Sequence, residues 1–415
     1  NTQKSTWDPK RETASTSCHY FLAPPLGLRV GLLGCPNLKT VCRSMLPHDY
    51  QPEHYESLLT RKVVRYLPSF EALGAPPPSL YRSPTSAFRM RAEFRVWHEG
   101  DDLNFVMFDR EKPKEPVIIE TFPFASLSIQ KRLPVLRDAL KNDAELRHKL
   151  FQIELLSTLS GDVLVTLIYH RKLGDEWAEA AKALSSKLAL QVVGRSRGQK
   201  VVLDRDWLTE TLTVQGKTFH YKQPEQAFIQ PNARVNESML TWACEQAPPS
   251  TRDLLELYCG IGNFTIPLSE KFRFVLATEV SKVATRAASE NLSLNAINNV
   301  EFARLAAEEV TEALSGTREF RRLKALSTPI ADYDLETVLV DPPRAGLDSA
   351  TLSLVGEFDQ ILYISCNPLT LLDNLSQLTE SHDIISLAFF DQFPYTDHLE
   401  CGVNLRRRGH NEAIE

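Results

Sequence analysis

From about residue 226 onward, apolar runs typical of strands alternate with segments typical of helices. We expect a helix over 233–246, and strands over 254–258, in "FVLATEV", up to residue 340 and over 361–364. Such alternation is typical of a parallel, doubly wound sheet with helices on both faces. Ligands of these sheets bind at the carboxyl ends of the strands. The sequence therefore predicts a Rossmann-like α/β domain over 226–415, with its functional site at that edge.

The preceding part of the chain has a different pattern. In "FRMRAEFRVWHEGDDLNFVMFD" apolar residues recur with a period of two, which predicts a strand, a turn and a partner strand. The polar face of the first strand carries Arg89, Arg91, Glu93, Arg95 and Trp97. Guanidinium groups pair with phosphates and stack on bases, so this face predicts an RNA-binding surface. A solvated sheet face with internal ion pairs is the alternative. We predict an α+β RNA-binding domain over 45–225.

The chain as a whole restricts the function classes. Its 415 residues suffice for two domains, its net charge is −6, and no 18-residue apolar stretch predicts a membrane span. The seven cysteines contain no Cys-x-x-Cys pair, which argues against zinc, an iron–sulfur cluster and secretion, and favours the reducing cytoplasm. The first methionine is Met45. We interpret residues 1–44 as a disordered tail or an upstream extension; a transit peptide is the alternative.

A glycine turn follows the first strand of the second part. In "DLLELYCGIGNF", Gly260 and Gly262 allow a ligand to approach the backbone before a helix. The third glycine of the dinucleotide fingerprint is replaced by Thr265, and Glu279 ends the next strand 19 residues after Gly260. An acidic residue there binds ribose hydroxyls. A nicotinamide dinucleotide and S-adenosylmethionine both fit, and the missing glycine favours the second.

Two later strands end at polar residues. "VDPPRAGLD" places Asp341 at a strand tip before two prolines that fix the backbone, and "YISCNP" places Cys366 at the next tip. Consecutive parallel strands bring their carboxyl ends to one edge, so these side chains should share one site. Glu400 is expected in a loop before a closing strand at 402–405.

These motifs, with "FDQFPYTDHLECGV", closely resemble the RNA uracil-C5 methyltransferase family. The first half, with "RSPTSAFRMRAEFRVWHEGDD" and "FIQPN", resembles its tRNA branch, and the likeness runs from about residue 45 to 406. The resemblance implies methyl transfer from S-adenosylmethionine to C5 of the T-loop uridine at tRNA position 54, with tRNA-like RNA such as tmRNA as a further substrate. It also implies a cytoplasmic, monomeric enzyme that needs no metal and no membrane.

The resemblance assigns roles to individual residues. Cys366 matches the nucleophile that adds to C6, and Glu400 matches the base that removes the C5 proton. A nearby Arg344 should lower the pKa of the thiol. The cofactor set comprises Gln230, Tyr258, Asn263, Glu279 and Asp341. The RNA set comprises Arg344, which matches a uracil or phosphate contact, Phe151, which matches an aromatic stacking in the opened T-loop, and the strand residues Arg89 and Arg91.

Three alternatives remain at this point. An amino-methyltransferase has an aromatic residue after its Pro-Pro, where this chain has Arg344, and a DNA cytosine methyltransferase has its cysteine after a proline. The third is a tRNA-binding folding factor whose catalysis is secondary. Rescue of tRNA function in cells by a Cys366→Ala variant would favour that third reading.

Overall fold

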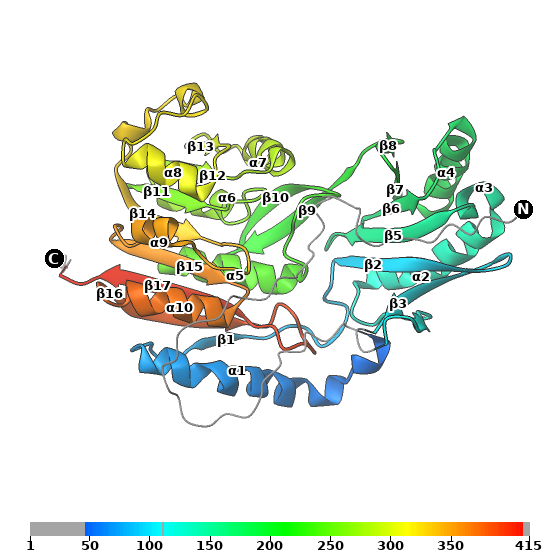
Figure 1. Ribbon diagram of the computed structural model, residues 1–415, viewed down its shortest axis with the longest axis horizontal. Helices are drawn as coiled ribbons and strands as arrows, with labels where there is room; N and C mark the ends of the chain where they lie inside the picture. Colours follow the sequence, from blue (N-terminus) through cyan, green and yellow to red (C-terminus); the bar gives the residue numbers. More distant parts are fainter. Residues whose placement is uncertain (1–45, 110–111, 410–415) are drawn as a thin grey trace, which may run out of the picture. The chain divides into compact units, whose positions relative to one another are not determined.

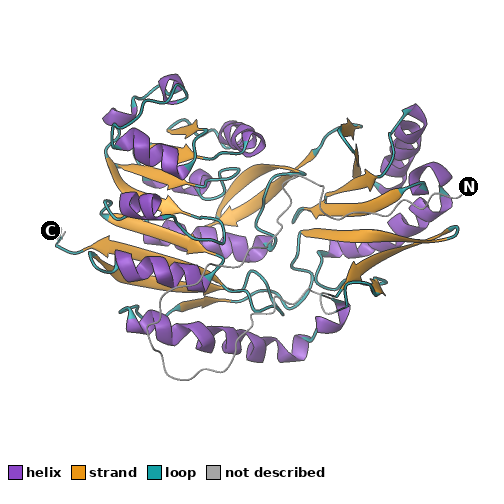
Figure 2. Ribbon diagram, in the orientation of Figure 1, coloured by secondary structure: helices purple, strands orange, loops and turns teal. Residues whose placement is uncertain are grey.

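The computed structural model describes residues 46–109 and 112–409, which belong to one compact unit. The interpretation of residues 1–44 lies outside the described residues. Two large sheets and a two-stranded hairpin make up the described part (Figures 1 and 2). None of its helices is long and apolar enough to cross a membrane.

The larger sheet has eight strands in the order β1-β16-β17-β15-β14-β11-β12-β13. Strands β11 to β15 run parallel, whereas β17 is antiparallel to β15 and β16. The predicted parallel α/β arrangement is confirmed. The strands are β1 (Ser79–Tyr81), β11 (Asp253–Leu257), β12 (Val275–Thr278), β13 (Val300–Ala303), β14 (Leu335–Val340), β15 (Gln360–Ser365), β16 (His382–Phe390) and β17 (Glu400–Arg407).

Helices cover both faces of this sheet because successive strand residues point to opposite sides. Leu255, Val338 and Ile361 pack in the core beneath α1, α8, α9 and α10, whereas Leu254 and Leu339 pack beneath α5 and α7. The helices are α1 (Tyr55–Ala72), α5 (Ala233–Gln246), α6 (Thr265–Leu268), α7 (Lys282–Leu294), α8 (Ala307–Leu314), α9 (Ser349–Val355) and α10 (Pro368–Leu378). Although α1 and β1 come first in the chain, both pack with this sheet (Figure 1).

The second sheet has seven strands in the order β4-β3-β2-β5-β6-β7-β8, antiparallel except for β6 and β7. In β2 the apolar face is buried and the face with Glu93 and Arg95 is exposed, as the period of two predicts. The strands are β2 (Arg91–Glu99), β3 (Asp102–Phe108), β4 (Pro116–Ile118), β5 (Leu150–Ser157), β6 (Val163–Tyr169), β7 (Gln191–Ser196) and β8 (Gln199–Val202). Helices α2 (Leu127–Asn142), α3 (Ala144–Arg147) and α4 (Asp175–Leu188) pack with its core.

A hairpin of β9 (Trp207–Val214) and β10 (Lys217–Pro224) follows the second sheet in the chain. Its apolar side chains Leu208, Leu212 and Phe219 belong to the same core as α5. The hairpin therefore packs on the helix that leads into the eight-stranded sheet.

The burial of residues in helix α1 does not follow their polarity. Val64 is 63% exposed, whereas Lys62 is 5% exposed. The reason is a distant partner, since the Lys62 ammonium forms an ion pair with Asp391.

Candidate active site at the carboxyl edge of the eight-stranded sheet

Four strands of the sheet bring polar side chains to one of its edges. Asp341 follows β14 and Cys366 follows β15, and these two strands are parallel neighbours. Glu400 opens β17, which runs antiparallel to β15, so it lies at the same edge. The expectation that Glu400 belongs to a loop was wrong, because β17 begins at this residue. Glu279 follows β12 on the other side of β11.

Cys366 lies between the end of a strand and the start of a helix. The last residue pair of β15 and β17 is Ser365 with Cys401, so Cys366 and Glu400 each stand one residue beyond it. Asn367 caps α10 by accepting a hydrogen bond from the Leu369 amide at 3.3 Å. The thiol therefore stands next to the positive end of an 11-residue helix, a setting that favours a thiolate.

Burial and the neighbouring carboxylates have the opposite effect and favour the neutral thiol of Cys366. Burial raises the pKa of the thiol well above its usual value, and the carboxylates of Glu400 and Asp341 raise it further. Arg344 lowers this pKa, as expected, but its effect is smaller than theirs. The expectation of a lowered thiol pKa was therefore wrong.

The two carboxyl groups also favour their neutral forms. The side chain of Glu400 is 2% exposed, and burial, followed by the charge of Asp341, raises its pKa well above the usual value. Burial raises the pKa of Asp341 to about 7. A carboxyl group with a raised pKa can exchange protons near neutral pH, which is what acid–base chemistry needs.

The loop that carries Asp341 and Arg344 is tied to the start of α10. The carbonyl oxygen of Arg344 accepts hydrogen bonds from Asn367 Nδ2 at 3.0 Å and Thr370 Oγ1 at 3.2 Å. Gly346 has φ +79°, and a Cβ there would lie 2.9 Å from Asn374 Oδ1. These contacts fix the loop relative to Cys366.

The backbone of the glycine turn is accessible at the same edge of the sheet. Gly260 has φ +56°, and a Cβ there would meet nothing within 4 Å, so its backbone faces open space. Its amide donates to Glu279 Oε2 at 3.2 Å, and the Ser281 amide donates to Glu279 Oε1 at 2.7 Å. Tyr258, before the turn, has a positive φ of 61°. An open backbone beside an anchored carboxylate fits an adenosyl group with a ribose.

Buried amides hold the other two residues of the predicted cofactor set. The side-chain amides of Asn263 and Asn236 exchange two hydrogen bonds of 2.9 Å. Gln230 Oε1 accepts a hydrogen bond from Gln392 Nε2 at 3.3 Å. Asn236 and Gln392 are contacts that the sequence analysis did not find, because nothing in the local pattern marks them.

Of the predicted RNA contacts, Phe151 lies on the open face of the seven-stranded sheet. The guanidinium of Arg95 lies 4.0 Å from the centre of its ring, and the centre of the His170 ring, which follows β6 in the chain, lies 4.2 Å from it. Trp97, on the same strand as Arg95, is 38% exposed. The structure therefore groups Arg95 and Phe151, two groups that can stack on bases.

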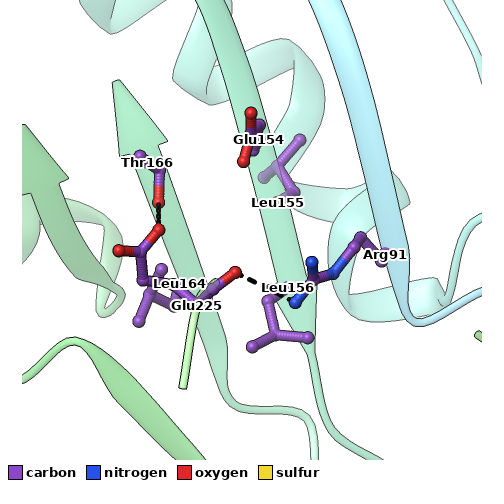
Figure 3. A pocket seen from close by; sticks show the side chains of 7 residues that line it. All are labelled: Arg91, Glu154, Leu155, Leu156, Leu164, Thr166 and Glu225. Atoms are coloured by element: carbon purple, nitrogen blue, oxygen red, sulfur yellow. Dashed lines mark hydrogen bonds between the residues drawn. The ribbon is translucent and has the colours of Figure 1, made fainter. Parts of the chain in front are cut away.

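Arg89 and Arg91 make contacts within the chain. Arg91 donates to the carbonyl oxygens of Glu225 at 3.0 Å and Ala227 at 3.1 Å, and Arg89 Nε donates to the Arg91 carbonyl at 2.8 Å. In Figure 3, Arg91 and Thr166 approach Glu225 from two sides of a small pocket. These contacts connect the start of β2 to the segment before Gln230.

The comparison with protein families decides between the classes of methyltransferase. The model of the tRNA (Uracil-5-)-methyltransferase family matches residues 54–408. The chain belongs to this family. A tRNA/tmRNA (uracil-C(5))-methyltransferase of Azoarcus sp. (strain BH72) is 49% identical over 86% of this chain and 98% of that protein. Another, from Acinetobacter baylyi, is 51% identical over 85% of this chain and 98% of its own length.

A solved structure shares the fold of this family member. The tRNA (uracil-54, C5)-methyltransferase of Pyrococcus abyssi, in complex with S-adenosyl-L-homocysteine, superposes with a TM-score of 0.63. The match covers 85% of this chain and 83% of that chain at 20% identity. The resemblance to RNA uracil-C5 methyltransferases and to their tRNA branch is confirmed by the family match and the relatives.

One residue beside the site of this tRNA (uracil-5-)-methyltransferase was missed by the sequence analysis. Phe228 is 64% exposed, although its neighbours Ala227 and Ile229 are buried. The segment is fixed, because Arg91 binds the Ala227 carbonyl and Met90 donates to the Pro231 carbonyl at 2.7 Å. An aromatic ring held in solvent two residues before Gln230 is available for stacking. Nothing in the sequence indicated that Phe228 is exposed, because it is an apolar residue between two apolar neighbours.

A buried carboxyl group beneath the site makes the stability depend on pH. Burial raises the pKa of Glu256 to about 8, and Thr265 donates a hydrogen bond to it at 2.6 Å. Because this pKa is higher than in the unfolded chain, its stabilising effect is complete below about pH 4.5 and is lost as pH rises through 8. Between pH 6 and 8.5 the free energy of unfolding should therefore fall less steeply in Glu256→Gln than in the wild type, by up to about 1.4 kcal/mol per pH unit.

Urea unfolding midpoints at several pH values measure this effect. Glu319→Gln is the matched control, because Glu319 is 85% exposed and its pKa is lowered by Lys324, so it is ionised throughout the range. If the unfolding midpoint changes with pH by the same amount in the wild type and in Glu256→Gln, Glu256 does not titrate in this pH range.

Proposed function

We propose that this protein transfers the methyl group of S-adenosylmethionine to C5 of uridine 54 in the T-loop of tRNA, and of the corresponding uridine in tmRNA, through a covalent adduct with Cys366. Relatives of about 50% identity that carry the name tRNA/tmRNA (uracil-C(5))-methyltransferase support the reaction class. The observation that carries the mechanism is the position of Cys366 and Glu400, one residue beyond the last pair of two adjacent strands.

The proposed reaction proceeds in three steps. The thiol of Cys366 gives up its proton to solvent, the resulting thiolate forms a bond to C6, and the electron pair of the C5–C6 double bond moves toward C5 and O4. C5 then forms a bond to the methyl carbon while the sulfonium–methyl bond breaks, which supplies the methyl group. Glu400 finally takes the C5 proton, the electrons of the C–H bond restore the double bond, and the C6–sulfur bond breaks to return the thiolate.

The open face of the seven-stranded sheet is the proposed RNA-binding surface. Phe151, Arg95 and the exposed Phe228 offer rings and a guanidinium group for unpaired bases. The target uridine has to leave its stack to reach Cys366, so the enzyme must flip the base. We assign residues 45–225 to RNA binding and 226–415 to methyl transfer, with α1 and β1 contributing to the latter sheet.

Trapping with a fluorinated substrate tests the mechanism. A T-arm RNA with 5-fluorouridine at position 54 is mixed with the protein and S-adenosylmethionine and run on a denaturing gel. Fluorine cannot leave as a proton does, so the adduct should persist as a shifted band. Absence of that band, with T-arm binding demonstrated, would contradict covalent catalysis at C5.

The titration of Asp341 gives a further expectation. The carboxylate of Asp341 attracts the sulfonium cation only when it is ionised, and its pKa is about 7. The Kd for S-adenosylmethionine should therefore fall about tenfold between pH 6 and pH 8, because affinity follows the ionised fraction. Asp341→Asn should remove this pH dependence.

Calorimetric titration at constant ionic strength measures these constants. Glu210→Gln is the control, because burial raises the pKa of Glu210 to about 7 as well, but this residue lies in the hairpin strand β9. A wild-type Kd that does not change with pH would contradict the role of Asp341.

A further inference from the structure

A buried ion pair links helix α1 to the segment that leads to Glu400. Lys62 is 5% exposed and Asp391 is 1% exposed, and Lys62 Nζ lies 2.6 Å from Asp391 Oδ1. The same ammonium donates to the carbonyl oxygen of Phe393 at 2.8 Å. A buried ion pair adds little net stability, because desolvation offsets the attraction, but it does fix which groups meet.

A second anchor of the same segment, residues 391–399, lies next to the site. Gln392 Oε1 accepts a hydrogen bond from the Asn232 amide at 2.8 Å, and Gln392 Nε2 donates to Gln230 Oε1. Asn232 is fully buried and also donates to Ser83 Oγ at 2.7 Å. The segment is thereby connected to the residues that precede α5.

The third anchor reaches the core of the seven-stranded sheet. The Tyr395 hydroxyl donates to the carbonyl oxygen of Thr85 at 2.6 Å, in the stretch that connects β1 with β2. Its ring lies 5.7 Å from that of Phe124 and 6.4 Å from that of Phe88, both in that core. Segment 391–399 therefore contacts the cores of both sheets, and Glu400 follows it directly in the chain.

Cys366 is held by a different set of contacts. Its turn is fixed by Asn367 and Thr370, which bind the Arg344 carbonyl, and by the cap of α10. The contacts of Lys62, Gln392 and Tyr395 act on segment 391–399, which precedes Glu400 in the chain. Cys366 and Glu400 share the pairing of β15 with β17, but only the segment that leads to Glu400 makes these three contacts.

We infer that Lys62, Asp391 and Tyr395 are positioning residues for the release of the methylated RNA: they place Glu400 relative to a uridine held by the RNA-binding sheet. The inference rests on the proposed function. Formation of the Cys366 adduct should then be independent of the anchors, whereas removal of the C5 proton should depend on them.

The rate of adduct formation and the rate of product release are measured in two variants, Lys62→Met and Tyr395→Phe. The second variant keeps the aromatic ring. With 5-fluorouridine RNA, each variant should form the trapped adduct at the wild-type rate. With natural T-arm RNA, the adduct should accumulate, and product release should slow about tenfold in Lys62→Met, because a small misplacement of a catalytic group is costly. Tyr395→Phe should slow release less, about threefold, since it loses one hydrogen bond.

Two further variants exclude a general loss of structure. Lys62→Met with Asp391→Leu replaces the ion pair by apolar groups, which should restore stability but not the rate of release. Arg82→Ala removes an exposed ion pair with Glu56 on the same helix α1 and should leave both rates unchanged. Variants that fold and release product at the wild-type rate, or that slow both steps equally, would overturn the inference. A wild type that forms neither product nor trapped adduct would instead contradict the proposed function.

Discussion

Cys366→Ala should abolish both the trapped adduct with 5-fluorouridine RNA and the methylation of natural T-arm RNA. Cys259 and Cys401, the other cysteines near this edge in the described part of the chain, are buried, whereas Cys366 is partly exposed, so we expect neither to take the place of the thiol. Without a bond to C6, C5 stays too weak a nucleophile. We expect the rate of methyl transfer to fall by at least about 10³-fold.

Binding measurements complete this experiment. Cys366 is half-buried at the tip of β15, and alanine differs from it only by the loss of the sulfur atom, so T-arm binding should stay within about threefold of wild type. Cys259→Ala and Cys401→Ala serve as controls that should retain the adduct. An adduct that survives in Cys366→Ala but disappears in Cys259→Ala would reassign the nucleophile.

The same variant tests the folding-factor alternative. A protein that binds and opens the T-loop remodels the RNA even without methyl transfer. If Cys366→Ala restores tRNA function in cells that lack the enzyme, RNA remodelling is the main role and methylation is secondary. Loss of function in that variant, with binding retained, would show that the methyl group is what the cell requires.

The position of the site could be predicted because a parallel sheet obeys simple rules. Apolar runs ending at Asp341 and Cys366 predict strand tips, and consecutive parallel strands place their tips at one edge. The period of two in β2 likewise predicted which face would be exposed. Such local patterns suffice to predict which side chains are buried wherever burial follows the regular repeat of a strand or helix.

Properties that depend on distant partners could not be predicted in this way. The burial of Lys62 depends on Asp391, 329 residues away, and no helical period predicts a buried lysine. The alternation of β2 predicted Arg91 as an RNA contact, but it did not predict the hydrogen bonds of this residue to the carbonyl groups of residues 225 and 227. The raised pKa of Cys366 depends first on burial and then on two carboxylates and one guanidinium, whose balance only the three-dimensional arrangement gives.

Glu400→Gln should stop the reaction after methyl transfer. Glutamine keeps the shape of the side chain but cannot accept the C5 proton, so the methylated uridine should stay bonded to Cys366. We expect natural T-arm RNA to give a protein–RNA band on a denaturing gel, with label from the methyl donor in that band. Turnover should fall by about 10²–10⁴-fold, the usual contribution of a positioned base.

The buried position of Glu400 makes a matched control necessary. Replacing any buried carboxyl group changes local charge, and Glu400 also raises the pKa of Cys366. Glu210→Gln removes another buried carboxyl group with a raised pKa, at 1% exposure in β9, and should turn over normally. Because Glu400→Gln removes a carboxylate that disfavours the thiolate, its adduct with 5-fluorouridine should form at least as fast as in the wild type. Slow adduct formation together with slow turnover would instead place Glu400 in the first step, as a group that orients the uridine.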